Sequence, residues 1–356
     1  MLKNIKIKNY RAIKDLEIKD FKKINLLVGD NNSGKTSVLE AILYLLAPTN
    51  PFVMADIVMR RGINTTIDAR TKQQTIDITS NEFWDGITSL FNTKDVKNKI
   101  HISSKQLQKV ASLDIEYDQN PKSFANTNLV SINQKNLTYN FVDENGNKTQ
   151  TGFSNIQGNH LTDQATTKIF GLSNAALIHP TQKWSQEIYG LLEEYCENPQ
   201  MKQDIVKMLH PIEPALEDFE INPKINCYLS GKDGYKLPLN HLGDGIRAIL
   251  MIMLYIFKLK NGVCLIDEIE NGLHYKSQGL MWKNVINTSK KFDTQIFATT
   301  HSYEMIENLV KLCEEGLVGE DDVMLYSLDR IEGKNYVNVF DAKSLEMAII
   351  TKGEVR

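Results

Sequence analysis

The chain has 356 residues, which is enough for one large α/β domain or two smaller ones with a well-buried core. Apolar residues make up 42% and charged residues 24%, a balance that excludes a disordered chain. The net charge of −3 excludes a global attraction to nucleic acid, so contact with DNA would need a local basic patch. The four cysteines form no CxxC pair, which favours a reducing compartment.

The sequence predicts neither a signal peptide nor a membrane span. The first eleven residues alternate apolar and basic side chains and lack the apolar core of a signal peptide. The longest apolar stretch, from Ala248 to Phe257, stops at Lys258 and is too short to cross a bilayer. We therefore expect a cytoplasmic protein without a membrane partner.

The chain begins with a predicted strand, glycine loop and helix. Residues 5–18 alternate apolar and charged side chains in two runs, as half-buried strands do. Residues 24–28 are mostly apolar without alternation, as expected of a strand that is buried on both faces. They lead into Gly29, and residues 37–46 then have the pattern of a helix that ends before Pro48. This order is the opening of a βαβ unit.

The middle of the chain, from about Thr65 to Asn159, predicts an antiparallel sheet. Short β-like runs recur between turns rich in Asn, Gly and Lys, and residues 144–147 (Glu-Asn-Gly-Asn) are typical of a hairpin turn. The runs are residues 99–102, 113–117, 129–132 and 137–141. Residues 183–216 then have a helical pattern, which prolines interrupt near its end.

The last third of the chain returns to alternating helices and strands. The predicted elements are a buried helix after Gly243, a strand at 262–266, a helix at 275–290, a strand at 294–299, a helix from Ser302 and a hairpin with strands at 323–328 and 336–340. The hairpin is expected to turn at residues 332–335. The fold class is therefore α/β, with two halves that flank a central insertion.

One motif predicts a phosphate site. Residues 29–36, Gly-Asp-Asn-Asn-Ser-Gly-Lys-Thr, match the phosphate-loop pattern GxxxxGK[ST]. Its glycines let the backbone N–H groups and the helix N-terminus face a phosphate. Lys35 supplies positive charge to the β- and γ-phosphates, and the Thr36 hydroxyl can bind Mg²⁺. We therefore expect ATP and Mg²⁺ as ligands, with nucleotide contacts from Asn31, Asn32, Ser33, Gly34, Lys35, Thr36 and Ser37.

Polar side chains follow two later apolar strands. Residues 263–266 lead into Asp267, which can hold Mg²⁺, and Glu268, which points the other way and can polarise a water. A solvated acidic turn is the alternative, and the phosphate loop upstream favours the site. His301 follows the next strand in the same manner. A lone histidine at a strand end is usually structural, but the order of the motifs favours a role in the site.

The order of these motifs resembles that of the ABC-type ATPase heads of SMC and RecF proteins, and most closely the OLD-like ATPases of bacterial anti-phage systems. The resemblance covers residues 1–46 and 239–340. It implies a P-loop NTPase fold of the ABC-ATPase type, with the Walker A motif at residues 29–36 and the Walker B motif at residues 263–267. It further implies a catalytic group of three residues: Lys35, Glu268 as the base, and His301 as the sensor of the γ-phosphate.

The resemblance also assigns three smaller motifs. Residues 270–274 fall where the family has its D-loop, and Arg11 resembles an N-terminal arginine that reaches the nucleotide phosphates. A solvated arginine at a strand end is the alternative for Arg11. Gly243, Asp244 and Gly245 occupy the place of the Ser-Gly-Gly signature, which contacts phosphate across a dimer. Because Asp244 should repel a phosphate, we hypothesise that the site closes slowly or with the help of an effector.

The head implied by the resemblance is split. The expected segments are the N-terminal half with Walker A at 1–64, a β-rich lobe at 65–182, a short helical arm at 183–222, and the C-terminal half with signature, Walker B, D-loop and switch histidine at 223–356. The family's glutamine loop has no clear position in the sequence. In such heads two chains enclose two ATP molecules, so we expect a homodimer or a higher oligomer.

The resemblance also bears on partners. OLD proteins carry a TOPRIM nuclease after the head, but only 55 residues follow His301, and they predict a hairpin and a short helix. Asp321 and Asp322 fit a solvated turn better than a metal site. We therefore expect an ATPase that acts as sensor or regulatory subunit for a separate effector, a TOPRIM-type or other nuclease or a toxin, in phage defence.

Three alternatives stay open. A small-molecule P-loop kinase would share Lys35, Thr36 and Asp267 but would not need His301. An AAA+ motor would need arginine fingers and a helical lid, which the sequence does not predict. A DNA-associated repair ATPase of the SMC or RecF type would use a basic face near the N-terminus, for which a solvated strand face is the competing explanation. That face would consist of Lys3, Lys6, Lys8, Lys14, Lys19, Lys22 and Lys23.

Overall fold

The computed structural model of the chain divides into two compact units. The residues that it describes are 1–47, 53, 57–58, 66–67, 74–76, 80–105, 112–118, 135–142, 146–154, 161–162, 174–221, 227–231 and 236–350. The first unit contains Met1–Phe21, Gly29–Ser173 and Leu328–Asn338, and the second contains Lys22–Val28, Asn174–Ser327 and Val339–Arg356. The chain therefore passes between the two units several times.

Most of the second unit is built around a six-stranded sheet with the order β11-β15-β16-β3-β17-β18. Its strands are β3 (Ile24–Val28), β11 (Ala175–Ile178), β15 (Val263–Ile266), β16 (Gln295–Thr299), β17 (Val323–Ile331) and β18 (Lys334–Asp341). All neighbouring pairs from β11 to β17 are parallel. Parallel pairing brings the carboxyl ends of β15, β16 and β3 to one edge, where ligands of such sheets bind.

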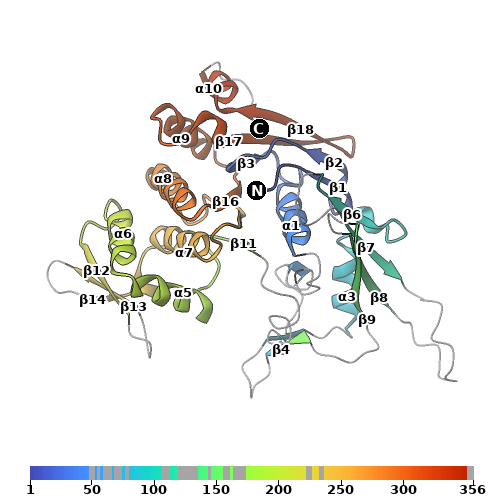
Figure 1. The fold of residues 1–356 in the computed structure, drawn as a ribbon, viewed down its shortest axis with the longest axis horizontal. Helices are drawn as coiled ribbons and strands as arrows, with labels where there is room; N and C mark the ends of the chain where they lie inside the picture. Colours follow the sequence, from blue (N-terminus) through green and yellow to red (C-terminus); the bar gives the residue numbers. More distant parts are fainter. Residues whose placement is uncertain are drawn as a thin grey trace. The chain divides into compact units, whose positions relative to one another are not determined.

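Every residue of β3, β15 and β16 is buried, which explains why these strands are apolar without alternation. Ile24, Leu26 and Val28 join one hydrophobic cluster with the helices of the second unit. Those helices are α5 (Gln186–Glu197), α6 (Pro199–Leu209), α7 (Asp244–Lys258), α8 (Tyr275–Phe292), α9 (Tyr303–Glu314) and α10 (Ala342–Ile350). The helices α7, α8 and α9 pack side by side in chain order (Figure 1).

Smaller elements complete the second unit. A three-stranded sheet consists of β12 (Leu216–Ile221), β13 (Cys227–Gly231) and β14 (Lys236–Pro238), which the sequence did not predict. Short 3₁₀ turns lie at Leu239–His241 and Glu320–Asp322, and the second confirms that Asp321 and Asp322 form a turn. None of the helices in the described part of the chain combines the length and the apolar character that a membrane span needs.

The first unit contains a six-stranded sheet with the order β2-β1-β6-β7-β8-β9, in which all pairs are antiparallel. Its strands are β1 (Ile5–Tyr10), β2 (Ile13–Ile18), β6 (Ile100–Ser103), β7 (Ser112–Asp118), β8 (Asn136–Val142) and β9 (Lys148–Ser154). The pair Val142 and Lys148 confirms the hairpin that the sequence predicts. Because β1 pairs with β6, the N-terminal strands β1 and β2 belong to the same sheet as the strands from the middle of the chain. The local sequence pattern could not indicate this pairing. The predicted run at residues 129–132 lies outside the described residues.

The helix α1 (Lys35–Leu46) packs against β1, β6 and β7 of this sheet. It ends just before Pro48, as the sequence predicts. The first unit also contains α3 (Asn81–Thr88), a 3₁₀ turn at Asn92–Lys94, and a small sheet of β4 (Thr66–Ile67), β5 (Gln74–Ile76) and β10 (Leu161–Thr162). Phe83, Trp84 and Ile87 of α3 are buried, and Ser80 caps this helix by accepting a hydrogen bond from the Phe83 amide.

The hairpin of β17 and β18 turns at Glu332 and Gly333, whose φ angles are 50° and 77°. Two consecutive positive φ angles are the mark of the two-residue hairpin turn that fits the twist of a sheet. We predict that Gly333→Val lowers the free energy of unfolding by about 1–2 kcal/mol, because a β-branched residue is strained in the left-handed region. Urea denaturation measures the loss. Glu332→Asn is the control and should not destabilise, since asparagine tolerates this region; equal losses for both variants would contradict the argument.

Candidate functional site

The phosphate loop begins directly after the last residue of β3 and belongs to the first unit. Gly29 has a φ of 131°, and a Cβ atom there would lie 2.2 Å from the carbonyl oxygen of Leu328. No other residue fits this position, because both the backbone angle and the space exclude a side chain. Gly34 has a φ of 109° and forms the N-terminal boundary of α1. The two glycines therefore determine how the chain turns from β3 into α1.

The side chains of the loop present hydrogen-bond donors. Lys35 is buried, and its Nζ donates to the carbonyl oxygens of Gly29 at 2.7 Å and Asp30 at 3.0 Å. The Oγ of Ser33 is buried without a hydrogen-bond partner among the described residues, and no side chain caps the N-terminus of α1. An ammonium group, a hydroxyl and uncapped helix N–H groups are the donors that a phosphate accepts from. The loop therefore fits the phosphate chain of a nucleotide.

The remaining predicted loop residues differ in exposure. Asn31 and Asn32 are exposed, Thr36 is half-buried and Ser37 is buried. A Mg²⁺ ion that is bound mainly through substrate phosphates needs one or two protein oxygens. The Thr36 hydroxyl and the Asp267 carboxylate, taken each by itself, are oxygen groups of the required kind. The chemistry of these groups fits the ion that the sequence predicts.

Arg11 has a buried partner that the sequence did not reveal. It lies between β1 and β2 with a φ of 51°, and its Nη1 donates to both carboxylate oxygens of Glu40 at 2.7 and 2.9 Å. The side chain of Glu40, on α1, is 4% exposed and also accepts a hydrogen bond from the hydroxyl of Tyr10 at 2.7 Å. The amide of Arg11 donates to the carbonyl of Leu90. The arginine is thus held by α1 and by the segment that follows α3.

Burial and charge shift the pKa values of Tyr10 and Arg11. Burial raises the pKa of Tyr10 well above its ordinary value, and the neighbouring Glu40 raises it further. Burial lowers the pKa of Arg11, but the charge of Glu40 outweighs this effect and the net shift is upward. Tyr10 therefore remains a hydrogen-bond donor and Arg11 remains a cation. The guanidinium is 17% exposed and keeps its Nε and Nη2 donors outside the hydrogen bonds to Glu40.

The predicted Walker B residues lie at the carboxyl end of β15 in the second unit. Asp267 is 5% exposed, and its Oδ1 accepts a hydrogen bond of 2.6 Å from the hydroxyl of Thr299 on β16. The same hydroxyl accepts a hydrogen bond of 2.7 Å from the amide of Glu268. Glu268 has a φ of 54°, in the left-handed region that residues other than glycine rarely adopt. The sequence thus predicted the positions of both carboxylates, but not the hydroxyl between them.

His179 is a further neighbour of Asp267 that the sequence missed. It follows β11, and its Nδ1 lies 3.8 Å from Oδ2 of Asp267. Gln182 lies in the same turn, where its Oε1 accepts a hydrogen bond from the amide of His179. No sequence signal pointed to these residues, because β11 is a short strand after a long segment without clear pattern.

The predicted switch histidine and D-loop lie beside one another. His301 is exposed, and its amide donates to Oε1 of Glu270 at 2.6 Å. The preceding residue, Thr300, donates through its amide to the carbonyl of Leu27 at the end of β3. Asn271 of the D-loop donates a short hydrogen bond to Oε2 of Glu268. The turn after β16 therefore contacts both the D-loop and the strand that leads into the phosphate loop.

The signature turn lies at the N-terminus of α7. Gly243 is the boundary residue of this helix, and the side chain of Asp244 is 78% exposed. Arg247, one turn along α7, places its Nη1 3.6 Å from Oδ1 of Asp244. A Cβ atom on Gly245 would lie 3.3 Å from the carbonyl oxygen of Gly272 in the D-loop. The structure thus brings the signature turn and the D-loop of one chain into contact.

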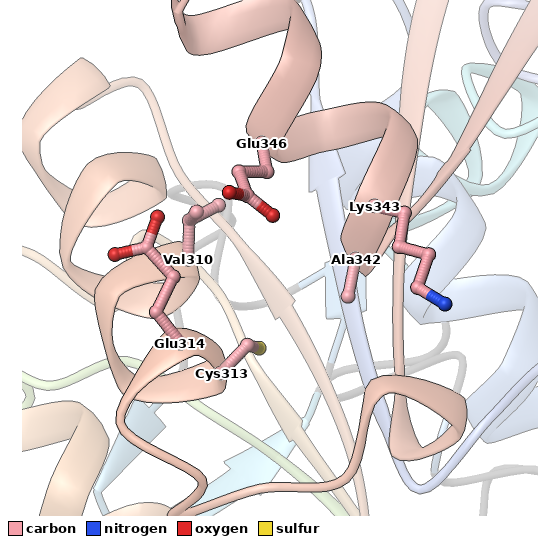
Figure 2. Close-up of a pocket in the computed structure, with 6 residues that line it drawn as sticks. All are labelled: Val310, Cys313, Glu314, Ala342, Lys343 and Glu346. Atoms are coloured by element: carbon pink, nitrogen blue, oxygen red, sulfur yellow. The ribbon is translucent and has the colours of Figure 1, made fainter.

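A cavity between α9 and α10 is separate from these motifs (Figure 2). Its volume is about 40 Å³. It is lined by Val310, Cys313, Glu314, Ala342, Lys343 and Glu346. Pockets that bind small molecules have volumes of about 300–1,000 Å³, so the cavity is far too small for a nucleotide. None of the predicted site residues lines it.

The Arg11 and Glu40 pair allows a stability test. We predict that Glu40→Gln lowers the free energy of unfolding by about 3 kcal/mol, because it leaves the largely buried Arg11 without an anion. Chemical denaturation with two probes measures the change. Glu17→Gln is the matched control, since the ion pair of Glu17 with Lys19 is more exposed and is expected to contribute less than about 1 kcal/mol. Equal losses in the two variants would show that the buried pair is not stabilising.

Comparisons with known proteins relate the chain to one family and to several individual proteins. The family model described as "AAA domain, putative AbiEii toxin, Type IV TA system" matches residues 24–307. A Helicobacter pylori protein named "ATP/GTP phosphatase" is 26% identical over 337 residues, which cover 88% of this chain and 89% of that protein. An uncharacterized protein of Methanocaldococcus jannaschii is 31% identical over 102 residues, 28% of this chain and 85% of that protein.

Among solved structures, an Smc head domain with an extended coiled coil, bound to the C-terminal domain of ScpA from Pyrococcus furiosus, has a TM-score of 0.48 and 12% identity. The match covers 99% of this chain and 99% of that chain. The family model spans most of the chain, including residues 29–36, 243–245, 263–267 and His301. The chain therefore belongs to the family of AAA domains described as putative AbiEii toxins, and it is a P-loop ATPase.

Proposed function

We propose that this protein binds ATP with Mg²⁺ in the loop of residues 29–36 and hydrolyses it to ADP and phosphate. The observation that carries the proposal is the loop itself, in which Gly29 and Gly34 have positive φ angles between β3 and α1, and Lys35 donates a hydrogen bond within the loop beside the uncapped N-terminus of α1. The name of the Helicobacter pylori relative, "ATP/GTP phosphatase", supports the same chemistry.

Each site residue has a role in this proposal. When bound, Mg²⁺ would neutralise charge on the phosphates and hold their orientation. Lys35 exchanges its hydrogen bonds to the loop carbonyls for hydrogen bonds to phosphate oxygens, and Arg11 adds a second cation. Glu268 orients and polarises the attacking water, and His301 senses the γ-phosphate. The remaining contribution is the positioning of these groups, which is how phosphoryl transfer is usually accelerated.

We further propose that two copies close around two ATP molecules. The signature turn of residues 243–245 is the surface that would complete the site of the second copy. Its support is the contact between Gly245 and the D-loop, because both motifs lie at a dimer interface in ATPases of this class. Arg247 partly neutralises Asp244, which lessens the repulsion of a phosphate by this carboxylate. Closure would therefore be slow but not prevented.

We propose as the biological role that ATP-driven closure regulates a separate effector, a nuclease or toxin, in phage defence. The description of the family, which names a toxin of a type IV system, supports a role in such a system. A DNA-repair role has weaker support. Lys8, Lys19, Lys22 and Lys23 form ion pairs with carboxylates of the same chain, so the predicted basic face is partly neutralised.

The proposed chemistry is tested by two substitutions. Lys35→Ala should weaken ATP binding about 10- to 100-fold, because it removes charged hydrogen bonds to the phosphates. Glu268→Gln should keep ATP binding and lower turnover about 100-fold or more, because the amide cannot take up a proton. Calorimetry measures binding and phosphate release measures turnover. Phosphorylated small molecules among the products would instead favour a kinase, and unchanged behaviour of both variants would refute the site.

The signature turn gives a second test. Asp244→Ser should raise ATP turnover about fivefold, since removal of a repulsive charge near a phosphate is worth about 1 kcal/mol at an exposed site. The same variant should increase the dimer fraction in light scattering with Glu268→Gln and ATP. Asp321→Ser is the control, because Asp321 is an exposed carboxylate outside the predicted motifs. If Asp244→Ser and Asp321→Ser behave alike, Asp244 does not face a phosphate.

A further inference from the structure

The end of β16 holds the turn that follows β15. The two strands are parallel neighbours, and Ile266 pairs with Ala298 one residue before the turn begins. From there, Thr299 and His301 make hydrogen bonds to four consecutive residues, Asp267 to Glu270. Two of these bonds involve the hydroxyl of Thr299, and a third joins its carbonyl to the amide of Ile269 at 3.0 Å.

The direction of the two hydroxyl bonds is fixed by chemistry. Thr299 is fully buried, and its Oγ1 carries a single proton. The amide of Glu268 can only donate, so Oγ1 accepts from it at 2.7 Å. The proton of Oγ1 is then directed to Oδ1 of Asp267 at 2.6 Å. One hydroxyl therefore fixes the rotamer of one carboxylate and the backbone of the next residue.

The backbone of Glu268 needs such support. A φ of 54° is rare for residues other than glycine and costs free energy unless neighbouring contacts hold it. The hydrogen bond from its amide to Thr299 is one contact that supports this angle, and the hydrogen bond from the Asn271 amide to the Glu268 carbonyl is another. The angle in turn determines where the Glu268 side chain projects relative to Asp267. A small error at this point moves the base and the metal ligand apart.

We propose that Thr299 is a positioning residue for the Walker B carboxylates, which sets both the orientation of Asp267 towards Mg²⁺ and the direction of Glu268 towards water. This inference rests on the proposed function of the site. The proposed role of Thr299 differs from a purely structural one because both hydrogen bonds of its hydroxyl involve the two predicted site residues, Asp267 and Glu268. Groups that orient metal ligands in this way typically change metal affinity or activity 10- to 100-fold when they are removed.

Thr294 offers a matched control, because it lies one residue before the start of β16, the strand that ends at Thr299. It is also fully buried, and its hydroxyl lies 3.1 Å from the carbonyl oxygens of Ile256 and Leu259. Thr294→Val removes a buried threonine hydroxyl without touching a predicted site residue. Thr299→Val removes the hydroxyl at the site and keeps the shape of the side chain. Thr299→Ser restores the hydroxyl and should therefore rescue the function.

The experiment compares the three variants with the wild-type chain in full length. Phosphate release gives kcat and KM, and electron paramagnetic resonance measures the affinity for Mn²⁺ in the presence of a non-hydrolysed ATP analogue. Urea denaturation gives the stability of each variant. If Thr299→Val is not folded by circular dichroism, Thr299→Ala replaces it in every measurement.

We expect Thr299→Val to lower kcat and weaken Mn²⁺ binding about 10- to 100-fold, with a smaller effect on KM. Thr299→Ser and Thr294→Val should stay within about twofold of the wild type in both quantities. Equal kcat and Mn²⁺ affinity in Thr299→Val and Thr294→Val would overturn the inference while the proposed ATPase function stands. If the wild type binds nucleotide without turnover, the Mn²⁺ titration decides alone. If it binds no nucleotide, both the function and the inference fail.

Discussion

The position of β3 between β16 and β17 is the constraint on which the site depends. Both pairings are parallel, and β3 is entirely buried, so its carboxyl end is fixed beside the end of β16. Gly29 follows immediately, and its contact with the carbonyl of Leu328 in β17 leaves room for no side chain. The amide of Thr300 reaches the carbonyl of Leu27 on the other side. The start of the phosphate loop is therefore set by ladder hydrogen bonds and not by flexible contacts.

Much of this arrangement can be predicted from the sequence. The parts that cannot be predicted depend on contacts between residues that are far apart in the chain. Fully buried strands such as β15 and β16 are recognisable from unbroken apolar runs that end in polar residues. Pairing between distant strands leaves no local signal, so the union of β1 with β6 and the short strand β11 were missed. Glu40 had one signal, a lone carboxylate within an apolar helix run, but its partner Arg11 lies 29 residues earlier.

The environment of Arg11 connects the phosphate loop with the antiparallel sheet of the first unit. Glu40 lies on α1, the helix that starts at Lys35, and Tyr10 at the end of β1 shares its carboxylate. A buried ion pair contributes little net stability compared with apolar packing, yet its loss is costly. The pair holds the guanidinium of Arg11 in one place. Such preorganisation is what a site that acts by charge stabilisation requires.

The packing of Gly245 against Gly272 has a consequence for communication between active sites. The signature turn lies against the D-loop, and Asn271 of that loop donates a hydrogen bond to Glu268. In the proposed dimer, the signature turn of one chain would contact the phosphate of the nucleotide bound by its partner. This contact would thus affect Glu268 of the first chain, which acts on the other nucleotide. Thermodynamic linkage makes this influence mutual, so the binding of each ATP would change the affinity of the other site for ATP. The contact between Gly245 and Gly272 would then make the two nucleotide sites of the dimer cooperative.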